Sequence, residues 1–239
     1  MLDSPKLCNT VTQCALFRDL LTEDCDQIVT AGRVYELPAG SFFFHQGEES
    51  TMLYVIVSGR TKLSMVTNEG DQVIVNYFGP GEGLGIVMAL NELPYPLSAE
   101  AIEPCEAVGW SRDTMLGLME HNAQLAINGM NMVGQRFGQM LNRFQDLATQ
   151  RVEQRVARAL MRLVRQFGRR TDDGVLIDIP LGREDLAQMT GTNVYNVSRI
   201  LSKWEANGFI ATGRKRVTLL QAHELVVLAE DIPSPRERK

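Results

Sequence analysis

The sequence predicts an α+β fold in which an antiparallel β-roll is followed by one long helix and then by a smaller, basic domain. Between residues 33 and 110, short runs of β-branched and aromatic residues alternate with turn clusters, a pattern typical of an antiparallel roll or barrel. Residues 123–149 instead carry apolar side chains at helical spacing. Charge separates the two ends: residues 1–150 hold 8 basic and 18 acidic residues, a net charge of −10, whereas residues 151–239 hold 16 and 11, a net charge of +5. The basic C-terminal part indicates an interaction with a polyanion.

The overall composition restricts the class of protein. A chain of 239 residues that is 44% hydrophobic is long enough to build two modest cores. Its four cysteines are too few and too unevenly spaced for a disulfide framework, and no charged-then-apolar signal segment opens the sequence. No apolar run reaches the roughly 20 residues that cross a bilayer. We therefore expect a cytoplasmic protein without a membrane span.

The first expected elements are a short helix and a series of strands. Thr22 is a favourable N-cap for a helix over residues 23–30, which ends before Gly32. Turn clusters such as Pro38-Ala39-Gly40 separate the strands. The strands predicted by the alternating pattern cover residues 33–37, 41–44, 52–57, 61–66, 72–78 and 106–110.

Two helices are expected after the roll. Ser111 is placed to cap the first, which runs to His121, and the second covers residues 123–149. Six apolar residues of the second helix alternate in steps of three and four and so form one seam: Met130, Val133, Phe137, Met140, Phe144 and Leu147. We interpret this seam as the interface of a helix-to-helix homodimer, the alternative being an ordinary core-facing helix. Close approach of two backbones would also explain three glycines, each of which weakens a helix by about 1 kcal/mol relative to Ala: Gly129, Gly134 and Gly138.

The next helix, over residues 151–168, has one apolar side and one arginine side. The arginines recur along one face: Arg151, Arg155, Arg158, Arg162, Arg165 and Arg169. We expect this face to be exposed to solvent, where it raises the local positive potential. At the other end of this part of the chain, the Pro- and charge-rich residues 231–239 are expected to be disordered.

Residues 181–204 have the spacing of a helix-turn-helix. Gly191 falls four residues after Ala187, as the turn between two closely packed helices requires. Ten to fourteen residues after Ala187 come the apolar residues that seat the second helix on the first: Val197, Ile200 and Leu201. The second helix then exposes side chains able to bond to bases or phosphates: Thr192, Asn193, Tyr195, Asn196, Arg199 and Lys203.

Residues 209–219 predict a β-hairpin, or wing, directly after this motif. Three cations lie at or just beyond its turn, within reach of a phosphate backbone: Arg214, Lys215 and Arg216. We expect Arg199 to face the bases of the major groove, and Arg183 to join the wing cations at the phosphates. The residues expected beside Arg199 at the bases are Asn193, Tyr195 and Asn196. The sequence therefore predicts a protein that binds double-stranded DNA.

The order of roll, long helix and winged helix-turn-helix resembles the CRP/FNR family of bacterial transcription regulators over nearly the whole chain. The stretch LYVIVSGRTKLSMVTNEGDQVIV is similar to the β-roll hairpins of the family, and LGREDLAQMTGTNVYNVSRILSKWEANGFI to its recognition motif, including Ser198-Arg199. The resemblance implies a cyclic-nucleotide-binding-type jelly roll, and homodimers that bind a palindrome with half-sites about one helical turn apart. It also implies RNA polymerase as a partner. The expected segments are a sensor domain (1–121), a dimerisation helix (122–150) and a winged helix-turn-helix domain (151–239).

The phosphate-binding cassette of the family differs in this sequence. That cassette has a Gly-Glu pair and, farther along, an Arg followed by Ser or Thr. The corresponding stretch, GEGLGIVMALNELPYPLSAEA, has Ile86 after Gly85, and Tyr95-Pro96 in place of the arginine and its neighbour. Because a buried cyclic phosphate would lose its charge-assisted partners, we expect no useful binding of cyclic AMP. The pocket of an effector, whose identity stays open, is expected at Leu84, Gly85, Ile86, Tyr95 and Pro96.

Two other ways of sensing a signal are carried as alternatives. The FNR branch of the family senses oxygen with an iron–sulfur cluster on closely spaced N-terminal cysteines and one central cysteine. Four cysteines are the right number for a cluster here, with wider spacing than in that motif: Cys8, Cys14, Cys25 and Cys105. Haem is the other alternative, without a distinctive ligand pattern among the histidines: His45, His121 and His223.

The recognition helix also differs from that of many family members. The glutamate with which they read a C·G pair is replaced by Tyr195, which cannot accept a hydrogen bond from cytosine as a carboxylate does. The target sequence of other members is therefore not expected to apply.

A β-roll also suits a different class of protein, a cupin-like metal-dependent enzyme. The three histidines supply no His-x-His pair or other metal-ligand spacing, and no Ser/His/Asp or glycine-rich phosphate motif stands out. We therefore predict that the protein is not an enzyme but a DNA-binding regulator controlled through its roll.

Overall fold

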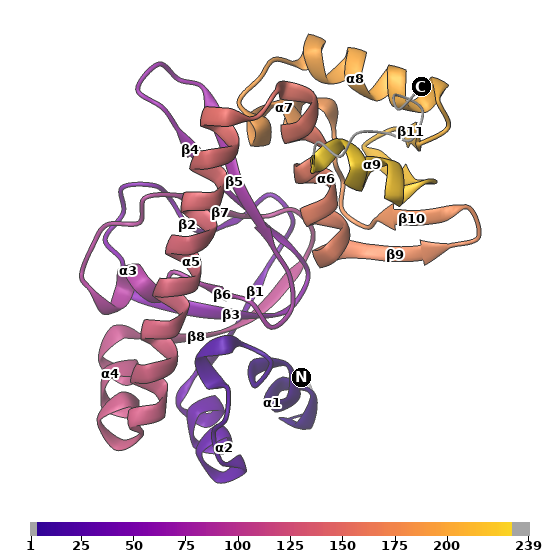
Figure 1. The fold of residues 1–239 in the computed structure, drawn as a ribbon. Coiled ribbons are helices and arrows are strands. Elements are labelled where there is room, and N and C mark those ends of the chain that lie inside the picture. Colours follow the sequence, from indigo (N-terminus) through magenta and orange to yellow (C-terminus); the bar gives the residue numbers. More distant parts are fainter. Residues whose placement is uncertain (1–3, 231–239) are drawn as a thin grey trace. The chain divides into compact units, whose positions relative to one another are not determined.

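A computed structural model describes residues 4–230, and the chain divides into two compact units, Met1–Met140 (unit 1) and Leu141–Lys239 (unit 2). The long helix α5 (Ala123–Thr149) has the predicted bounds and passes from the first unit into the second (Figure 1). The predicted disorder of residues 231–239 falls outside the described residues. The domain boundaries proposed from the sequence stay a prediction.

Four helical segments lie at one end of the roll in unit 1 (Figure 1). They are α1 (Ser4–Val11), η1 (Ala15–Phe17), α2 (Thr22–Ala31) and α4 (Arg112–His121). Trp110 ties them to the sheet, because its ring lies 5.4 Å from that of Phe17 and its Nε1 donates to the carbonyl oxygen of Ile28 at 2.7 Å. The predicted Ser111 cap is confirmed, since its hydroxyl accepts from the amide of Thr114. The predicted Thr22 cap is wrong: the helix already begins there, and the preceding cap position has no side-chain bond.

The roll consists of two antiparallel four-stranded sheets. The first has the order β1-β8-β3-β6, with strands at Arg33–Leu37 (β1), Cys105–Ser111 (β8), Met52–Ser58 (β3) and Gly83–Leu84 (β6). The second has the order β2-β7-β4-β5, with strands at Phe42–Phe44 (β2), Ser98–Ala101 (β7), Thr61–Val66 (β4) and Gln72–Phe78 (β5). All six strands expected from the sequence are confirmed to within one residue at each end.

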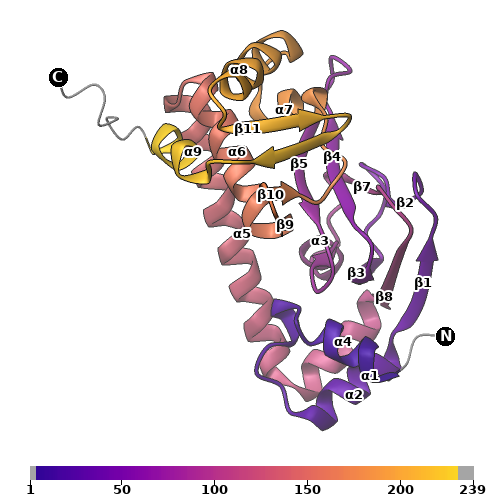
Figure 2. The same ribbon diagram turned by 90° about the vertical axis from the view of Figure 1, so that its right-hand side faces the viewer.

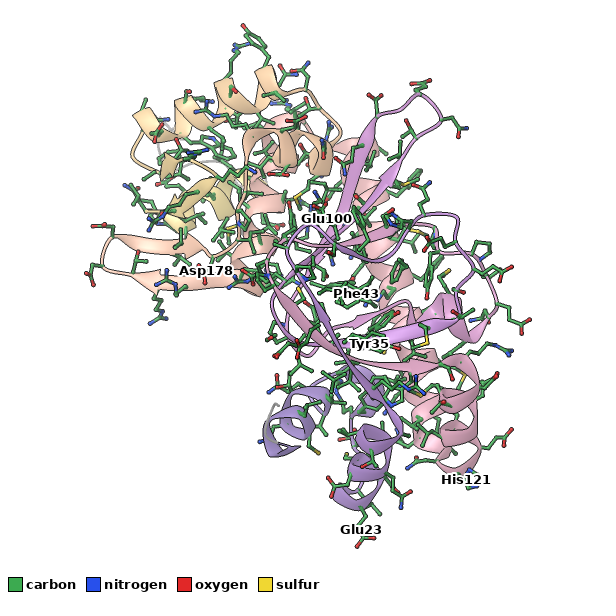
Figure 3. The ribbon with its side chains drawn as sticks, turned by 180° about the vertical axis from the view of Figure 1, so that it is seen from behind. Glu23, Tyr35, Phe43, Glu100, His121 and Asp178 are labelled. Carbon is green, nitrogen blue, oxygen red and sulfur yellow. The ribbon has the colours of Figure 1, made fainter. Side chains whose placement is uncertain are left out.

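An aromatic cluster lies inside the roll. The ring of Tyr54 stands edge-on to that of Tyr35 at 5.3 Å and lies 5.2 Å from the ring of Phe43. Figure 3 shows where Tyr35 and Phe43 lie in the roll. Gly109 of β8 pairs with Tyr54 across the sheet, and a Cβ at this position would come within 2.7 Å of the Tyr35 ring and 2.8 Å of the Tyr54 ring. The glycine is therefore required by close packing of these two rings.

Three short elements of the roll were not expected. Strand β7 reads Ser-Ala-Glu-Ala, which has little β propensity, and forms because β2 and β4 pair with it on both sides. Strand β6 has only two residues, and helix α3 (Ile86–Leu90) follows it after Gly85. These elements depend on contacts between distant parts of the sequence.

Unit 2 combines helices with a third sheet of order β11-β12-β10-β9. Its elements are α6 (Val152–Phe167), β9 (Gly168–Thr171), β10 (Gly174–Ile177), α7 (Arg183–Thr190), α8 (Val194–Ala206), β11 (Ile210–Gly213), β12 (Arg216–Leu219) and α9 (Ala222–Ala229). The helix-turn-helix is α7 and α8, and the expected wing is the β11–β12 hairpin beside α8 (Figure 2). The strands β9 and β10 and the helix α9 were not expected.

The arginine face of α6 is exposed at Arg151, Arg165 and Arg169, as the sequence predicts, but its three middle arginines are engaged within the protein. Arg155 donates to the carbonyl oxygens of Thr190, at 2.8 Å, and Gly191, at 3.2 Å. Arg158 and Arg162 both donate to the carboxylate of Asp146. These guanidinium groups therefore hold α6 to its neighbours within unit 2, and the prediction for them is wrong.

Asp146, near the end of α5, is the carboxylate that receives the two arginines. It accepts from Arg158 at 2.7 Å and from Arg162 at 3.2 Å, and is only 8% exposed. Arg158 also donates from Nε to the carbonyl oxygen of Ala229 at 2.8 Å, so it joins three helices.

Candidate functional site

The turn between α7 and α8 has the geometry that the sequence spacing predicts. Gly191 adopts the left-handed conformation (φ 60°, ψ 47°), and its amide donates to the carbonyl oxygen of Ala187. Asn193 then caps α8, because its side-chain oxygen accepts from the amide of Asn196 at 2.9 Å. The start of α8 is thus fixed by backbone and side-chain bonds together.

The inner face of α8 is seated on a buried apolar layer. Val197, Leu201 and Trp204 are buried, as are Leu186 and Ala187 on α7. The seating roles predicted for Val197 and Leu201 are therefore confirmed. Ile200 is half-buried and lines a surface pocket instead, while Trp204, which the sequence analysis did not assign, takes a central place in the layer.

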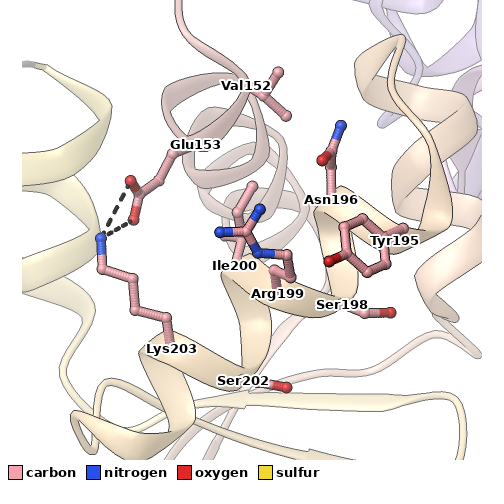
Figure 4. A pocket seen from close by; sticks show the side chains of 9 residues that line it. All are labelled: Val152, Glu153, Tyr195, Asn196, Ser198, Arg199, Ile200, Ser202 and Lys203. Atoms are coloured by element: carbon pink, nitrogen blue, oxygen red, sulfur yellow. Dashed lines mark hydrogen bonds and ion pairs between the residues drawn. The ribbon is translucent and has the colours of Figure 1, made fainter.

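The outer face of α8 presents the polar side chains that the sequence places there (Figure 4). Tyr195 is 69% exposed, and the guanidinium carbon of Arg199 lies 5.8 Å from the centroid of its ring. Asn196 donates from its side-chain amide to the hydroxyl of Thr192 at 3.1 Å. Ser198 is half-buried on the same helix. Hydroxyl, amide and guanidinium groups are therefore available along one face.

Lys203 has a partner that the sequence analysis missed. Its Nζ lies 3.0 Å and 3.4 Å from the two carboxylate oxygens of Glu153, in the first turn of α6 (Figure 4). Trp204 donates from Nε1 to the same Glu153 at 3.0 Å. An acidic residue in the first turn of a helix is ordinary, so the sequence held no signal for this contact. A role for Lys203 at DNA stays a prediction.

The wing is hydrogen-bonded to α8 through its first strand, β11. Thr212 donates from its amide to Glu205 at 2.8 Å and from its hydroxyl at 3.0 Å, and these bonds lower the pKa of Glu205. Lys215, at the tip, has a positive φ of 50°. The predicted phosphate-binding cations are all exposed: Arg183, Arg214, Lys215 and Arg216.

The predicted seam of α5 is an exposed apolar stripe. Its six side chains are between 44% and 70% exposed: Met130, Val133, Phe137, Met140, Phe144 and Leu147. A Cβ added at Gly134 or Gly138 would meet nothing within 4 Å among the described residues, so space is open beside the stripe. Gly129 differs, because it packs within the chain near Leu16 and Met119, and its predicted role between two backbones is not supported.

A cavity of about 310 Å³ lies in unit 1 between the roll, α3 and the first part of α5. Four of the five residues predicted for an effector pocket line it: Gly85, Ile86, Tyr95 and Pro96. The fifth, Leu84, is instead buried in the core of the roll, so its predicted place on the pocket wall is wrong.

The polar groups at this cavity are engaged by the protein itself. The hydroxyl of Tyr95 donates to the carbonyl oxygen of Met52 at 2.5 Å, and its ring stacks on Phe44 at 3.8 Å. Arg136 donates to the carbonyl oxygen of Gly83 at 3.1 Å, and its guanidinium lies 4.5 Å from the ring centroid of Phe78. Burial lowers the pKa of Arg136, and nearby Glu82 opposes this effect.

The cysteines do not form one cluster of thiolates. Burial raises the pKa of Cys14 and of Cys105 to about 11, which keeps both thiols protonated near neutral pH. Cys105 donates to the carbonyl oxygen of Arg60, whereas Cys8 donates to the carboxylate of Asp26 in the N-terminal helices. Within residues 4–230, no group of three or more His, Cys, Asp or Glu side chains is arranged to hold a metal ion.

The histidines are also dispersed. His45 stacks on Phe42 at 4.4 Å, His121 bonds to the carbonyl oxygen of Gly117, and His223 faces Glu224. The described lining of the cavity contains neither histidine nor cysteine. The iron–sulfur and haem alternatives therefore gain no support from this arrangement. None of the helices described here has the length and apolar character needed to span a membrane.

Each of the two units matches the model of a known domain family. Residues 34–122 match the model of the cyclic nucleotide-binding domain, and residues 154–228 match that of the Crp-like helix-turn-helix domain. The chain is 25% identical over 190 residues to the "CRP-like cAMP-activated global transcriptional regulator" of Mycobacterium tuberculosis, covering 80% of this chain and 85% of that protein. It is 27% identical over 207 residues to the "Transcriptional activator protein anr" of Pseudomonas aeruginosa, covering 87% and 84%.

A solved structure agrees with these relatives. The Thermus thermophilus catabolite activator protein is 27% identical, with a TM-score of 0.54 over 91% of this chain and 99% of that one. The predicted fold class, with a nucleotide-binding-type roll, a long helix and a C-terminal Crp-like helix-turn-helix, is confirmed. With an exposed recognition helix and wing on such a fold, the chain belongs to the CRP/FNR family of transcription regulators, which are DNA-binding proteins and not enzymes.

Proposed function

We propose that this protein is a homodimer that binds a palindromic DNA site through α8 and the wing, under the control of a signal sensed in the β-roll. The observation that carries this proposal is the outer face of α8, where Arg199 and Tyr195 are exposed to solvent while the inner face of the helix packs on a buried apolar layer. A helix of this kind fits the major groove and reads base edges there. We place this activity in the bacterial cytoplasm, with RNA polymerase as the partner.

The contacts divide into two classes. Arg199 offers two parallel donors that suit the O6 and N7 atoms of guanine, and the polar residues beside it supply further bonds to bases. Arg183 and the three wing cations are exposed and suit phosphates, which fix the register of the protein without reading sequence. Specificity is therefore expected from α8, and salt-dependent affinity from the wing.

The α5 stripe supports the dimer. Six apolar side chains exposed at heptad spacing are unfavourable in water and favourable against an equivalent helix. Open space at Gly134 and Gly138 leaves room for a second backbone beside the stripe. Two recognition helices related by a twofold axis would then bind half-sites about 34 Å apart, one helical turn of DNA.

Cyclic AMP does not fit the residues of this roll. Ile86, Tyr95 and Pro96 line the cavity and offer neither a carboxylate for a ribose nor a cation for a cyclic phosphate. Arg136, the cation among the described lining residues, donates to the carbonyl oxygen of Gly83. The signal is therefore expected to be a different molecule.

The DNA-reading proposal is tested by selecting operators from a random library and titrating them across salt concentrations. Arg199→Ala should weaken binding by about 1–3 kcal/mol per half-site and relax the preference at one base pair, since it removes a bidentate base contact. Arg214→Ala should weaken all sequences alike and lower the salt slope by about 1 per protomer. Arg165→Ala, at an exposed arginine near the end of α6, is the control and should keep the preference. If Arg199→Ala keeps its preference while Arg214→Ala loses it, the wing is the reader.

The dimer proposal is tested by Phe137→Asp, which places a charge at the middle of the stripe. An unpaired buried charge should raise the dimer dissociation constant by at least about 100-fold. Sedimentation equilibrium measures the change, and Gln135→Asp, at an exposed residue of α5 off the stripe, is the control. An unchanged dimer in the Phe137 variant would remove the seam assignment.

A further inference from the structure

The cavity of unit 1 has an almost wholly apolar lining. Aromatic and aliphatic side chains from the β2-β7-β4-β5 sheet, the residues before β7, α3 and α5 converge on it, including Phe44, Leu63, Phe78, Met88, Leu97 and Met132. Its volume of about 310 Å³ lies at the low end of the roughly 300–1,000 Å³ typical of small-molecule sites. A ligand of this size that enters such a cavity is favoured by removal of apolar surface from water.

The few polar groups of the cavity are already bonded within the protein. Tyr95 directs its hydroxyl at the backbone of Met52, both as donor and as acceptor. Arg136 is held by the Gly83 carbonyl, stacks on Phe78 and has the Glu82 carboxylate nearby as its counter-charge. An anionic ligand would lose its hydration here without gaining a cation that is free to pair with it.

We propose that this cavity binds a small, neutral, apolar molecule, and that the domain does not recognise cyclic nucleotides or other anions. The inference rests on the proposed function, because it names the class of signal for the sensor of that regulator. A neutral ligand needs no charge-assisted partner, so the contacts of Arg136 and Tyr95 can stay as they are.

The cavity and the exposed stripe share side chains. Val133, Phe137 and Met140 line the cavity, and the same three residues belong to the seam of α5. A molecule in the cavity therefore touches side chains that a second copy of the chain would pack against. Ligand binding thus has a direct physical route to the dimer interface.

The ligand class is tested on the full-length protein with 1-aminoanthracene, a neutral dye whose fluorescence rises in apolar surroundings. Decan-1-ol, decanoate and cyclic AMP are then compared as displacing agents. We expect saturable binding of the dye and displacement by decan-1-ol at a concentration at least about tenfold lower than by decanoate, because the carboxylate must be desolvated without a free cation. Tighter binding of decanoate or cyclic AMP, or no binding of the dye, would overturn the proposal.

The location is tested by filling the cavity. Met88→Trp and Pro96→Trp each add an indole at the lining and should abolish dye binding, whereas Leu93→Trp adds one at an exposed residue outside the lining and should not. Two filling variants are used, and thermal unfolding identifies either one that fails to fold. Dye binding that persists in a folded filling variant would place the site elsewhere. Because no DNA enters these assays, their failure is distinct from failure of the operator selection.

Discussion

The cations of α6 and those of α8 and the wing have the same chemistry and opposite environments. Arg155 and Arg158 on α6 use their donors on carbonyl and carboxylate oxygens within unit 2. Arg199 and Arg214 are exposed, and within the described part of the chain neither has a hydrogen bond or ion pair. A cation that already has an internal partner stabilises the fold, whereas an exposed one is available to phosphates and bases.

The same distinction applies to the roll. Arg136 lies at the cavity, where a cation would suit a phosphate, yet its donors are directed at the Gly83 carbonyl. An arginine in this protein therefore cannot be assigned to ligand binding from its residue type alone. Its role depends on the partners of its guanidinium group, which only the three-dimensional structure shows.

The largest expected effect concerns the arginines of α6, which have partners within unit 2. Asp146→Ala leaves Arg158 and Arg162, whose side chains are 29% and 37% exposed, without their shared carboxylate, and should lower the free energy of unfolding of unit 2 by about 1–3 kcal/mol. Urea unfolding followed by tryptophan fluorescence measures this loss. A Trp110→Phe background makes the signal specific, since the chain has 2 tryptophans and the other, Trp204, lies in unit 2.

An exposed carboxylate on the same arginine supplies the matched control. Glu230 lies 3.8 Å from Arg158, with its side chain 60% exposed, so Glu230→Ala should cost less than about 1 kcal/mol. If Asp146→Ala and Glu230→Ala lower the free energy of unfolding equally, the buried carboxylate contributes no more than the exposed one. The distinction between buried and exposed partners would then be wrong.

Local spacing explains which parts of the molecule could be predicted from the sequence. The turn at Gly191, the seat of Val197 and the cap at Ser111 each depend on residues within about ten positions of one another, and the structure has them as expected. The strands with alternating patterns and the full length of α5 were predicted for the same reason.

The rest depends on contacts between distant residues. Arg155 and Arg158 find their carbonyl acceptors 35 and 71 residues away in sequence, so their face reads as solvent-exposed in the sequence alone. Strand β7 has low intrinsic propensity and forms through its neighbours. Four of the predicted pocket residues line the cavity, but the sequence predicted neither the rest of its wall nor its apolar character, because the lining comes from both sheets and two helices.

The smallest expected effect concerns Lys203, which stands between the two classes of cation. It extends from the recognition helix, as Arg199 does, but is paired with Glu153, as the α6 arginines are paired with their acceptors. Both oxygens of Glu153 lie within 3.4 Å of the ammonium group, so this carboxylate competes with DNA phosphates for it. We expect Glu153 to limit the affinity of the protein for DNA of any sequence.

Glu153→Gln tests this expectation, because glutamine keeps an acceptor for the indole N–H of Trp204 while removing the charge. Released Lys203 should reach a phosphate, steepen the plot of log K against log salt by up to about 1 per protomer, and raise affinity for random DNA at low salt. Lys203→Ala alone should leave the salt slope unchanged, and in the Glu153→Gln background it should cancel the gain, which a double-mutant cycle measures. A lower slope for Lys203→Ala alone would show instead that Lys203 already contacts phosphate in the wild-type complex. Lys203 would then be a phosphate-binding residue like the wing cations. The role of Glu153 would be limited to its hydrogen bond with Trp204 in the buried layer beneath α8.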